Sequence, residues 1–231
     1  MSEERYYTRL AAAYVRGHAI KYAIPQLPEA LSTKPFDHLN PEEMQQIIDA
    51  GRRSDLKIYR FKTTHGEMPR IRKVMGFLKS IRFDTLLDVG SGRGVFLIPF
   101  LTEFPWVAVT AADILPHRVA FLNEIAAGGI TNLTAIEANI CCQPLPDKSV
   151  DVVTLLEVLE HILDVETAVC SAVRMAKKHI VVSVPSRPDD NPEHIHLLTR
   201  DRLTELFMGA GCTKLHFDGV NGHLIMIATL S

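Results

Sequence analysis

The sequence predicts an α/β fold preceded by a helical segment, and three features of the chain support this prediction. From residue 85 onward, short apolar runs typical of buried strands alternate with longer segments of helical periodicity. The first apolar run leads into a glycine-rich turn at residues 90–94. The last two runs are joined by Asn221-Gly222, a dipeptide typical of a two-residue hairpin.

Composition limits the number of domains and the class of protein. A chain of 231 residues with 47% apolar content can bury one substantial core and at most a small accessory domain. The formal net charge of −2 gives no overall preference for nucleic acid. No apolar run approaches the roughly 18 residues of a membrane span, and the cysteines lack zinc-type spacing. We therefore expect a reduced, cytoplasmic protein that does not enter a membrane.

Residues 1–68 are expected to form a helical segment without a recognisable motif. Residues 6–22 have the composition of a helix, which ends where two prolines interrupt it. A second helix is indicated by Asn40 as the N-cap, Pro41 at the first helical position and Gly51 just after the end.

Basic side chains gather between Arg52 and Arg82, and two interpretations remain open. They could form a positive rim over an active site that takes a phosphate-bearing substrate. They could instead be the solvated face of a helix near residues 69–80, whose apolar stripe would face the core. The second interpretation is favoured, because lysine and arginine normally occupy the outer face of such a helix.

The glycine turn follows a short buried strand at residues 85–89 and allows the backbone to approach a ligand closely. Gly90, Gly92 and Gly94 follow the pattern Gly-x-Gly-x-Gly, whereas a dinucleotide site places its third glycine one residue later. Asp88, directly before the first glycine, would add negative charge where a pyrophosphate must lie. A ligand with a cationic end suits this turn better.

The segment Leu-Asp-Val-Gly-Ser-Gly-Arg-Gly resembles the first motif of class I S-adenosylmethionine-dependent methyltransferases. In that family the acidic residue and the glycine turn hold the methionine portion of the cofactor. The resemblance therefore implies cofactor contacts from Asp88, Gly90, Ser91, Gly92 and Gly94. It also implies a Rossmann-like sheet of seven strands, mostly parallel, with a C-terminal β-hairpin that supplies one antiparallel strand.

Asp113 lies at the end of the strand expected over residues 107–112, where a carboxylate can accept from both ribose hydroxyls. Ribose is common to NAD and S-adenosylmethionine, so this position does not separate the two cofactors. A cap for the helix that begins near Pro116 is the less favoured role for Asp113. The resemblance extends the cofactor contacts to the neighbouring Ile114.

A second match to the family lies at residues 150–161, which resemble its fourth strand and the exit from that strand. Before it, a strand near residues 133–138 ends at Asn139, where the family commonly has an aspartate that accepts from the adenine amino group. The next backbone amide, here that of Ile140, meets a ring nitrogen in the family. Asparagine can still accept through its carbonyl, so the departure keeps a hydrogen bond and loses a charge.

Glu157, Glu160 and His161 form the candidate catalytic group, at i, i+3 and i+4 of the helix expected to leave the fourth strand. Two carboxylates and an imidazole beside the cofactor could bind Mg2+ or Mn2+, which would lower the pKa of a coordinated substrate hydroxyl. His194 and His196 add imidazoles after the fifth strand, at the same edge of the sheet.

With His194 included, this group is similar to the metal site of small-RNA 3′-terminal 2′-O-methyltransferases. Its Glu-Glu-His part also resembles ubiquinone-pathway O-methyltransferases. The resemblance implies a metal held by Glu157, Glu160, His161 and His194. Two alternatives stay open. In one, Glu157 only borders the cofactor, Glu160 faces water and His161 shapes the substrate wall. In the other, His194 or His196 acts as a metal-free general base.

The sequence thus predicts an S-adenosylmethionine-dependent methyltransferase that methylates a hydroxyl of a small-molecule, RNA or nucleotide acceptor. The predicted domains are a helical segment at residues 1–68 that covers the substrate cleft and a cofactor-binding methyltransferase domain at residues 69–231. Two other classes remain open. One is a catalytically inactive cofactor-binding regulatory or partner subunit, which Asn139 would favour, and the other, less favoured, is an NAD-dependent oxidoreductase.

Overall fold

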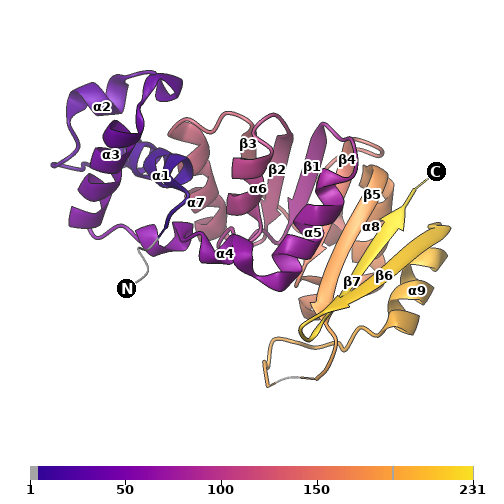
Figure 1. Ribbon diagram of the computed structural model, residues 1–231. Helices are drawn as coiled ribbons and strands as arrows, with labels where there is room; N and C mark the ends of the chain where they lie inside the picture. Colours follow the sequence, from indigo (N-terminus) through magenta and orange to yellow (C-terminus); the bar gives the residue numbers. More distant parts are fainter. Residues whose placement is uncertain (1–4, 189, 231) are drawn as a thin grey trace.

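A sheet of seven strands forms the centre of the structure, a computed structural model that describes residues 5–188 and 190–230 (Figure 1). The strands are β1 (Thr85–Val89), β2 (Ala108–Asp113), β3 (Leu133–Glu137), β4 (Val150–Leu156), β5 (Ala176–Pro185), β6 (Lys214–Val220) and β7 (His223–Thr229). Their order is β3-β2-β1-β4-β5-β7-β6. β7 is antiparallel to both of its neighbours, and the other pairings are parallel. The predicted Rossmann-like sheet with its C-terminal hairpin is confirmed.

Helices cover both faces of this sheet, because successive strand residues point to opposite sides and both sides are apolar. Leu86 packs with the helices on one face, and Leu87 with those on the other. The first face carries α5 (Pro69–Lys79), α6 (Leu97–Glu103) and α7 (Pro116–Ala127), and the second carries α8 (Val165–Met175) and α9 (Arg200–Gly209). None of the described helices is long and apolar enough to span a membrane.

The N-terminal helices extend the first of these two cores. They are α1 (Thr8–Lys21), α2 (Glu29–Thr33), α3 (Pro41–Arg53) and α4 (Thr64–Glu67), with 3-10 turns η1 (Phe36–His38) and η2 (Ile58–Phe61). In Figure 1, α1, α2 and α3 lie beside α7 at one end of the sheet, and α4 connects them to α5. The buried residues of α1 and α3 belong to the same apolar cluster as those of α6 and α7.

α1 crosses α7 at very short range, which small residues make possible. A Cβ on Gly17 would lie 1.7 Å from the carbonyl oxygen of Glu124, and a Cβ on Gly128 would lie 1.7 Å from that of Ala13. The two backbones therefore touch where these glycines meet the opposite helix.

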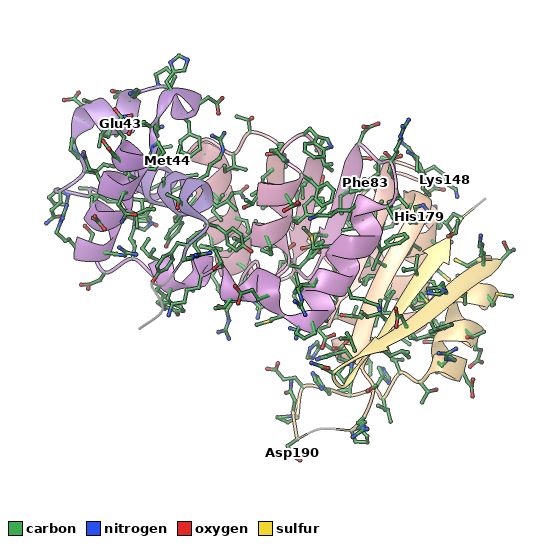
Figure 2. All side chains as sticks on the ribbon, in the orientation of Figure 1. Glu43, Met44, Phe83, Lys148, His179 and Asp190 are labelled. Atoms are coloured by element: carbon green, nitrogen blue, oxygen red, sulfur yellow. The ribbon has the colours of Figure 1, made fainter. Side chains whose placement is uncertain are left out.

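α3 begins as expected and ends later than expected. Asn40 and Glu43 form a capping box, in which each side chain accepts a hydrogen bond from the other residue's backbone amide at 2.9 Å. Glu43 is labelled in Figure 2. The expectation that Gly51 follows the helix is wrong, since the helix continues to Arg53. Gly51 serves packing instead, because a Cβ there would lie 2.4 Å from a methyl carbon of Val15.

Candidate cofactor and active site

The glycine turn lies at the carboxyl end of β1, where the strand order reverses between β1 and β4. Such a switch point is the usual position of a ligand crevice in an open α/β sheet. Gly90, Gly92 and Gly94 have φ values of +67°, +58° and +79°, which other residues rarely adopt. A Cβ on Gly90 would also lie 2.6 Å from a methyl carbon of Val158. Gly90 is therefore packed against Val158, whereas a Cβ on Gly92 would meet nothing closer than 3.6 Å, so the backbone of the turn is uncovered at Gly92.

Asp88 is 3% exposed and lies just before the turn. Its Oδ1 accepts a hydrogen bond from Oγ1 of Thr154 on β4 at 2.7 Å. Burial nevertheless raises the pKa of Asp88 to about 6, because a carboxylate is poorly solvated there. A cationic group placed against this carboxylate would reverse that shift, which is the chemistry expected for a ligand ammonium.

Asp113 is equally buried at the end of β2 and ties that strand to the glycine turn. Its Oδ2 accepts from the Gly92 amide at 2.9 Å and lies 3.5 Å from Nη1 of Arg118. Its Oδ1 accepts from the Leu115 amide at 3.0 Å. The carboxylate therefore supports the turn that leads into α7, but it does not cap the helix, whose N-cap is Leu115 with no side-chain cap hydrogen bond.

The residues expected near an adenine ring lie at the ends of β2 and β3. Ile114 is 63% exposed, which leaves a large apolar side chain uncovered next to Asp113. Ile140 is buried and opens the 3-10 turn η3 (Ile140–Cys142). Asn139 caps that turn, because its Oδ1 accepts from the Cys141 amide at 2.9 Å. Its carbonyl thus already has one donor, and only its second lone pair remains for an adenine amine.

The structure does not place Glu157 on a helix face with Glu160 and His161, contrary to the expectation. The chain forms only the 3-10 turn η4 (Leu159–His161), and Glu157 precedes it with φ +57°. The Oε1 atom of Glu157 accepts from Oγ of Ser183 at 2.6 Å, and Oε2 lies 3.0 Å from Nδ1 of His223. The left-handed backbone turns this side chain toward β5 and β7. Sequence spacing assumed helical geometry and therefore missed Ser183 and His223 as its neighbours.

Glu160, His161 and His194 do come together, with one potential ligand atom from each within 4.8 Å of the others. Glu160 is fully buried, so the alternative in which it faces water is wrong. The rings of His161 and His194 meet edge to face with centroids 4.8 Å apart. Nδ1 of His161 lies 2.9 Å from the Glu193 carbonyl oxygen. A carbonyl can only accept, so this nitrogen donates, and Nε2 of neutral His161 keeps its lone pair.

The segment after β5 is pinned to η4, which explains how His194 reaches this cluster. The Glu160 carbonyl accepts from the amides of Ile195 and His196, at 2.9 Å and 3.3 Å. The Nε2 atom of His196 donates to the Ile162 carbonyl at 3.0 Å, so in this conformation the His196 side chain holds its segment against the chain that follows η4. His196 is not part of the three-residue cluster.

Two cavities lie at opposite edges of the sheet. One of about 270 Å3 adjoins the glycine turn, and three arginines from separate parts of the sequence contribute to its lining. The full lining is Tyr59, Arg60, His65, Arg93, Val95 and Arg118. The other, of about 460 Å3, includes Asp84 and Trp106 at the amino end of the strands, away from the turn. Of the 31 residues from Arg52 to Arg82, only Tyr59, Arg60 and His65 line the first cavity.

The structure is thus a Rossmann-like α/β fold with a glycine turn at the carboxyl end of β1 and a buried carboxylate on each side of that turn. Residues 87–182 match the methyltransferase domain family. This segment is therefore a methyltransferase domain, and the sheet that contains it has the fold of S-adenosylmethionine-dependent methyltransferases.

Comparison with individual proteins agrees with this family. The chain is 37% identical over 141 residues to a probable S-adenosylmethionine-dependent methyltransferase of Mycobacterium tuberculosis, covering 57% of this chain and 48% of the relative. It is 46% identical over 52 residues to ribosomal RNA small subunit methyltransferase G of Levilactobacillus brevis, covering 22% and 21%. The chain thus spans about half or less of these curated relatives. The fold is similar to a SAM-dependent methyltransferase from Archaeoglobus fulgidus, with a TM-score of 0.57, 16% identity, and coverage of 70% of this chain and 91% of that one.

Proposed function

We propose that the protein transfers a methyl group from S-adenosylmethionine to a hydroxyl of an acceptor. The observation that carries this proposal is the pair of buried carboxylates, Asp88 and Asp113, on the two sides of the glycine turn. Asp88 would pair with the cofactor ammonium, and Asp113 would accept from the ribose hydroxyls. Ile114 and Ile140 would border the adenine, with Asn139 accepting from its amino group.

Methyl transfer from a sulfonium requires an aligned nucleophile and, for a hydroxyl, removal of its proton. His161, His194 and His196 are the imidazoles at the carboxyl edge near β4 and β5. Neutral imidazole suits this proton transfer near neutral pH. Because Nδ1 of His161 donates to the Glu193 carbonyl, Nε2 of its neutral ring carries the lone pair that can accept a proton, which favours His161 as the base in the absence of a metal.

The cluster of Glu160, His161 and His194 also fits a divalent metal such as Mg2+ or Mn2+. Ligands on one ion lie about 3–4 Å apart, since metal–ligand bonds are about 2 Å, so the 4.8 Å limit requires only a small contraction. The Glu193 carbonyl orients His161 as second-shell acceptors do in metal sites. A bound metal would lower the pKa of a coordinated acceptor hydroxyl. Glu157 would then serve the cofactor side, held by Ser183.

Cofactor choice is tested by calorimetric titration of the whole chain. S-adenosylhomocysteine should bind at micromolar concentration and NAD should not, because Asp88 favours a cation and opposes a pyrophosphate. NAD binding without S-adenosylhomocysteine binding would instead assign an oxidoreductase.

A second candidate is a cofactor-binding regulatory or partner subunit without catalysis. Asn139 supports it, because the family usually has an acidic residue there and this asparagine is occupied by its cap. Incubation with labelled S-adenosylmethionine and pools of metabolites and of RNA separates the two candidates. Methyl transfer to any acceptor eliminates the inactive subunit.

A further inference from the structure

We propose that the cavity beside the glycine turn binds a doubly charged oxyanion, such as a phosphate monoester, carried by the methyl acceptor. This inference rests on the proposed methyl transfer and names the chemical class of its substrate. The cavity is lined by η2, α4, the glycine turn and α7. Its distinctive residues come from three separate segments of the chain: Arg60 and His65 from the first, Arg93 from the second and Arg118 from the third.

Charge balance supports a dianion. Of the three arginines, Arg118 faces the Asp113 carboxylate at 3.5 Å. Within residues 5–188 and 190–230, Arg60 and Arg93 form no ion pair with a carboxylate. Because one of the three arginines is paired with Asp113, two positive charges remain, and a dianion would neutralise them.

The position of Arg60 is fixed by an aromatic ring. Its guanidinium carbon lies 4.8 Å from the centre of the Phe121 ring, a cation–π contact that keeps the positive charge intact. The Nε atom of Arg60 is buried and has no hydrogen-bond partner among the described residues. Arg60 is therefore placed by packing, with its charge left for another partner.

His65 contributes hydrogen-bonding capacity and little charge. Burial lowers the pKa of His65, so the ring is neutral at neutral pH. Its Nδ1 is buried without a hydrogen-bond partner in the described part of the chain. A polar ligand that drew this ring toward the cavity would satisfy it.

The cofactor itself does not supply the required negative charge. Its amino-acid end carries one carboxylate and one ammonium, and its sulfonium adds a further positive charge. Two unpaired arginines exceed what a single carboxylate neutralises, and they would repel the sulfonium unless another anion were present. The acceptor is the component that can bring that anion.

The size of the cavity limits the acceptor. A volume of about 270 Å3 accommodates one anionic group and a few attached atoms, whereas a nucleic-acid strand requires a continuous basic groove. The cavity therefore fits a small phosphorylated acceptor or the phosphorylated end of a larger one.

The test titrates inorganic phosphate at pH 8, where it is mainly a dianion, into the full chain saturated with S-adenosylhomocysteine. Wild type should bind phosphate, and Arg60→Gln and Arg93→Gln should each weaken that binding at least tenfold. Affinity for S-adenosylhomocysteine should stay within twofold. Arg93→Gln controls for a folding defect in Arg60→Gln, because Arg93 is an exposed loop residue whereas Arg60 packs on Phe121. Arg53→Gln, an exposed arginine of α3, is the matched control and should leave phosphate binding unchanged.

The outcomes distinguish an anion carried by the acceptor from the carboxylate of the cofactor. They also distinguish failure of this inference from failure of the proposed function. If both variants lose affinity for S-adenosylhomocysteine but not for its decarboxylated analogue, the arginines bind the cofactor carboxylate, and the inference is overturned. Saturable cofactor binding with no phosphate binding, or equal phosphate binding by wild type and both arginine variants, also overturns it, and leaves methyl transfer standing. Failure of wild type to bind S-adenosylhomocysteine would overturn the proposed function itself.

Discussion

Asp88 Oδ1 lies 2.7 Å from Oγ1 of Thr154 in the interior of the sheet, so a hydroxyl and not a cation holds the carboxylate before the glycine turn. A hydroxyl compensates only part of the cost of burying a charge, which is why the pKa is raised to about 6. The cofactor ammonium would complete this environment.

Cofactor affinity should therefore depend on pH through Asp88. Below about pH 6 the unliganded carboxyl is protonated and must lose its proton to pair with an ammonium. S-adenosylhomocysteine affinity should fall up to tenfold per pH unit as the pH decreases from 6 to 5, and should level off above 7. Calorimetry across this range measures it, with Asp88→Asn as a variant of weak and nearly pH-independent affinity. A flat wild-type profile would place the ammonium elsewhere.

The same pKa shift has a consequence for stability without cofactor. A carboxyl whose pKa is raised in the folded state costs stability above the folded pKa, and this cost disappears as the pH falls toward the unfolded value. The rise from 3.8 to about 6 corresponds to about 3 kcal/mol at neutral pH. Asp88→Asn should raise the free energy of unfolding at pH 7.5 by about 1–3 kcal/mol, with less gain at pH 4.5. The control is Asp84→Asn, because Asp84 is exposed just before the same strand. Urea titrations of this variant should show neither effect.

Gly92→Ala should reduce cofactor affinity far more than stability. A Cβ there meets nothing closer than 3.6 Å, so the folded state pays only for the left-handed backbone, about 1–2 kcal/mol. The methyl group would nevertheless occupy the face of the turn that a ligand must approach, and affinity should fall at least tenfold. Gly211→Ala also places alanine at a positive φ, +98°, where the backbone penalty is at least as large, and should leave affinity intact. Equal losses in both variants would point to a general destabilisation.

Metal removal separates the two catalytic schemes. If Glu160, His161 and His194 hold a metal, EDTA, Glu160→Gln and His161→Asn should each abolish turnover while leaving S-adenosylhomocysteine affinity unchanged. His38→Asn, an exposed histidine of the N-terminal segment, is the matched control. Full turnover in EDTA, with no response to added Mg2+ or Mn2+, would leave a histidine as general base.

Gly17→Ala should test how firmly the N-terminal helices are joined to the sheet. The added Cβ would lie 1.7 Å from the Glu124 carbonyl oxygen, which neither backbone can avoid without separating α1 from α7. We expect a loss of about 3 kcal/mol or more in the free energy of unfolding. Gly76→Ala, in a helical position with no described heavy atom within 4 Å of the new Cβ, should instead stabilise by about 0.5–1 kcal/mol. Similar effects from both changes would show that α1 moves freely over α7.

Sequence patterns predicted the strands and the glycine turn well because those signals are local. Val89 and Gly90 follow one another in the chain, and apolar alternation with positive-φ glycines is readable without tertiary information. Asn221-Gly222 likewise specified its own hairpin.

The parts that could not be predicted depend on contacts between distant segments. Glu157 adopts a left-handed conformation that no spacing rule anticipates, and its neighbours come from β5 and β7. Gly51 looked like a helix terminator because its packing partner, Val15, is in another helix. Arg60 was one charge in a basic run, and only the fold places it near Arg93 and Arg118.

The bond between Asp113 and the Gly92 amide bears on how the two substrates affect each other's binding. Asp113 contacts both the turn and Arg118. Ribose hydroxyls that donate hydrogen bonds to its oxygens would weaken its ion pair with the guanidinium. Arg118 would then be less neutralised, and the neighbouring cavity would attract an anion more strongly. The two substrates would therefore bind with positive cooperativity as one carboxylate changes partners, and whichever arrives first would raise the affinity for the other by the same factor.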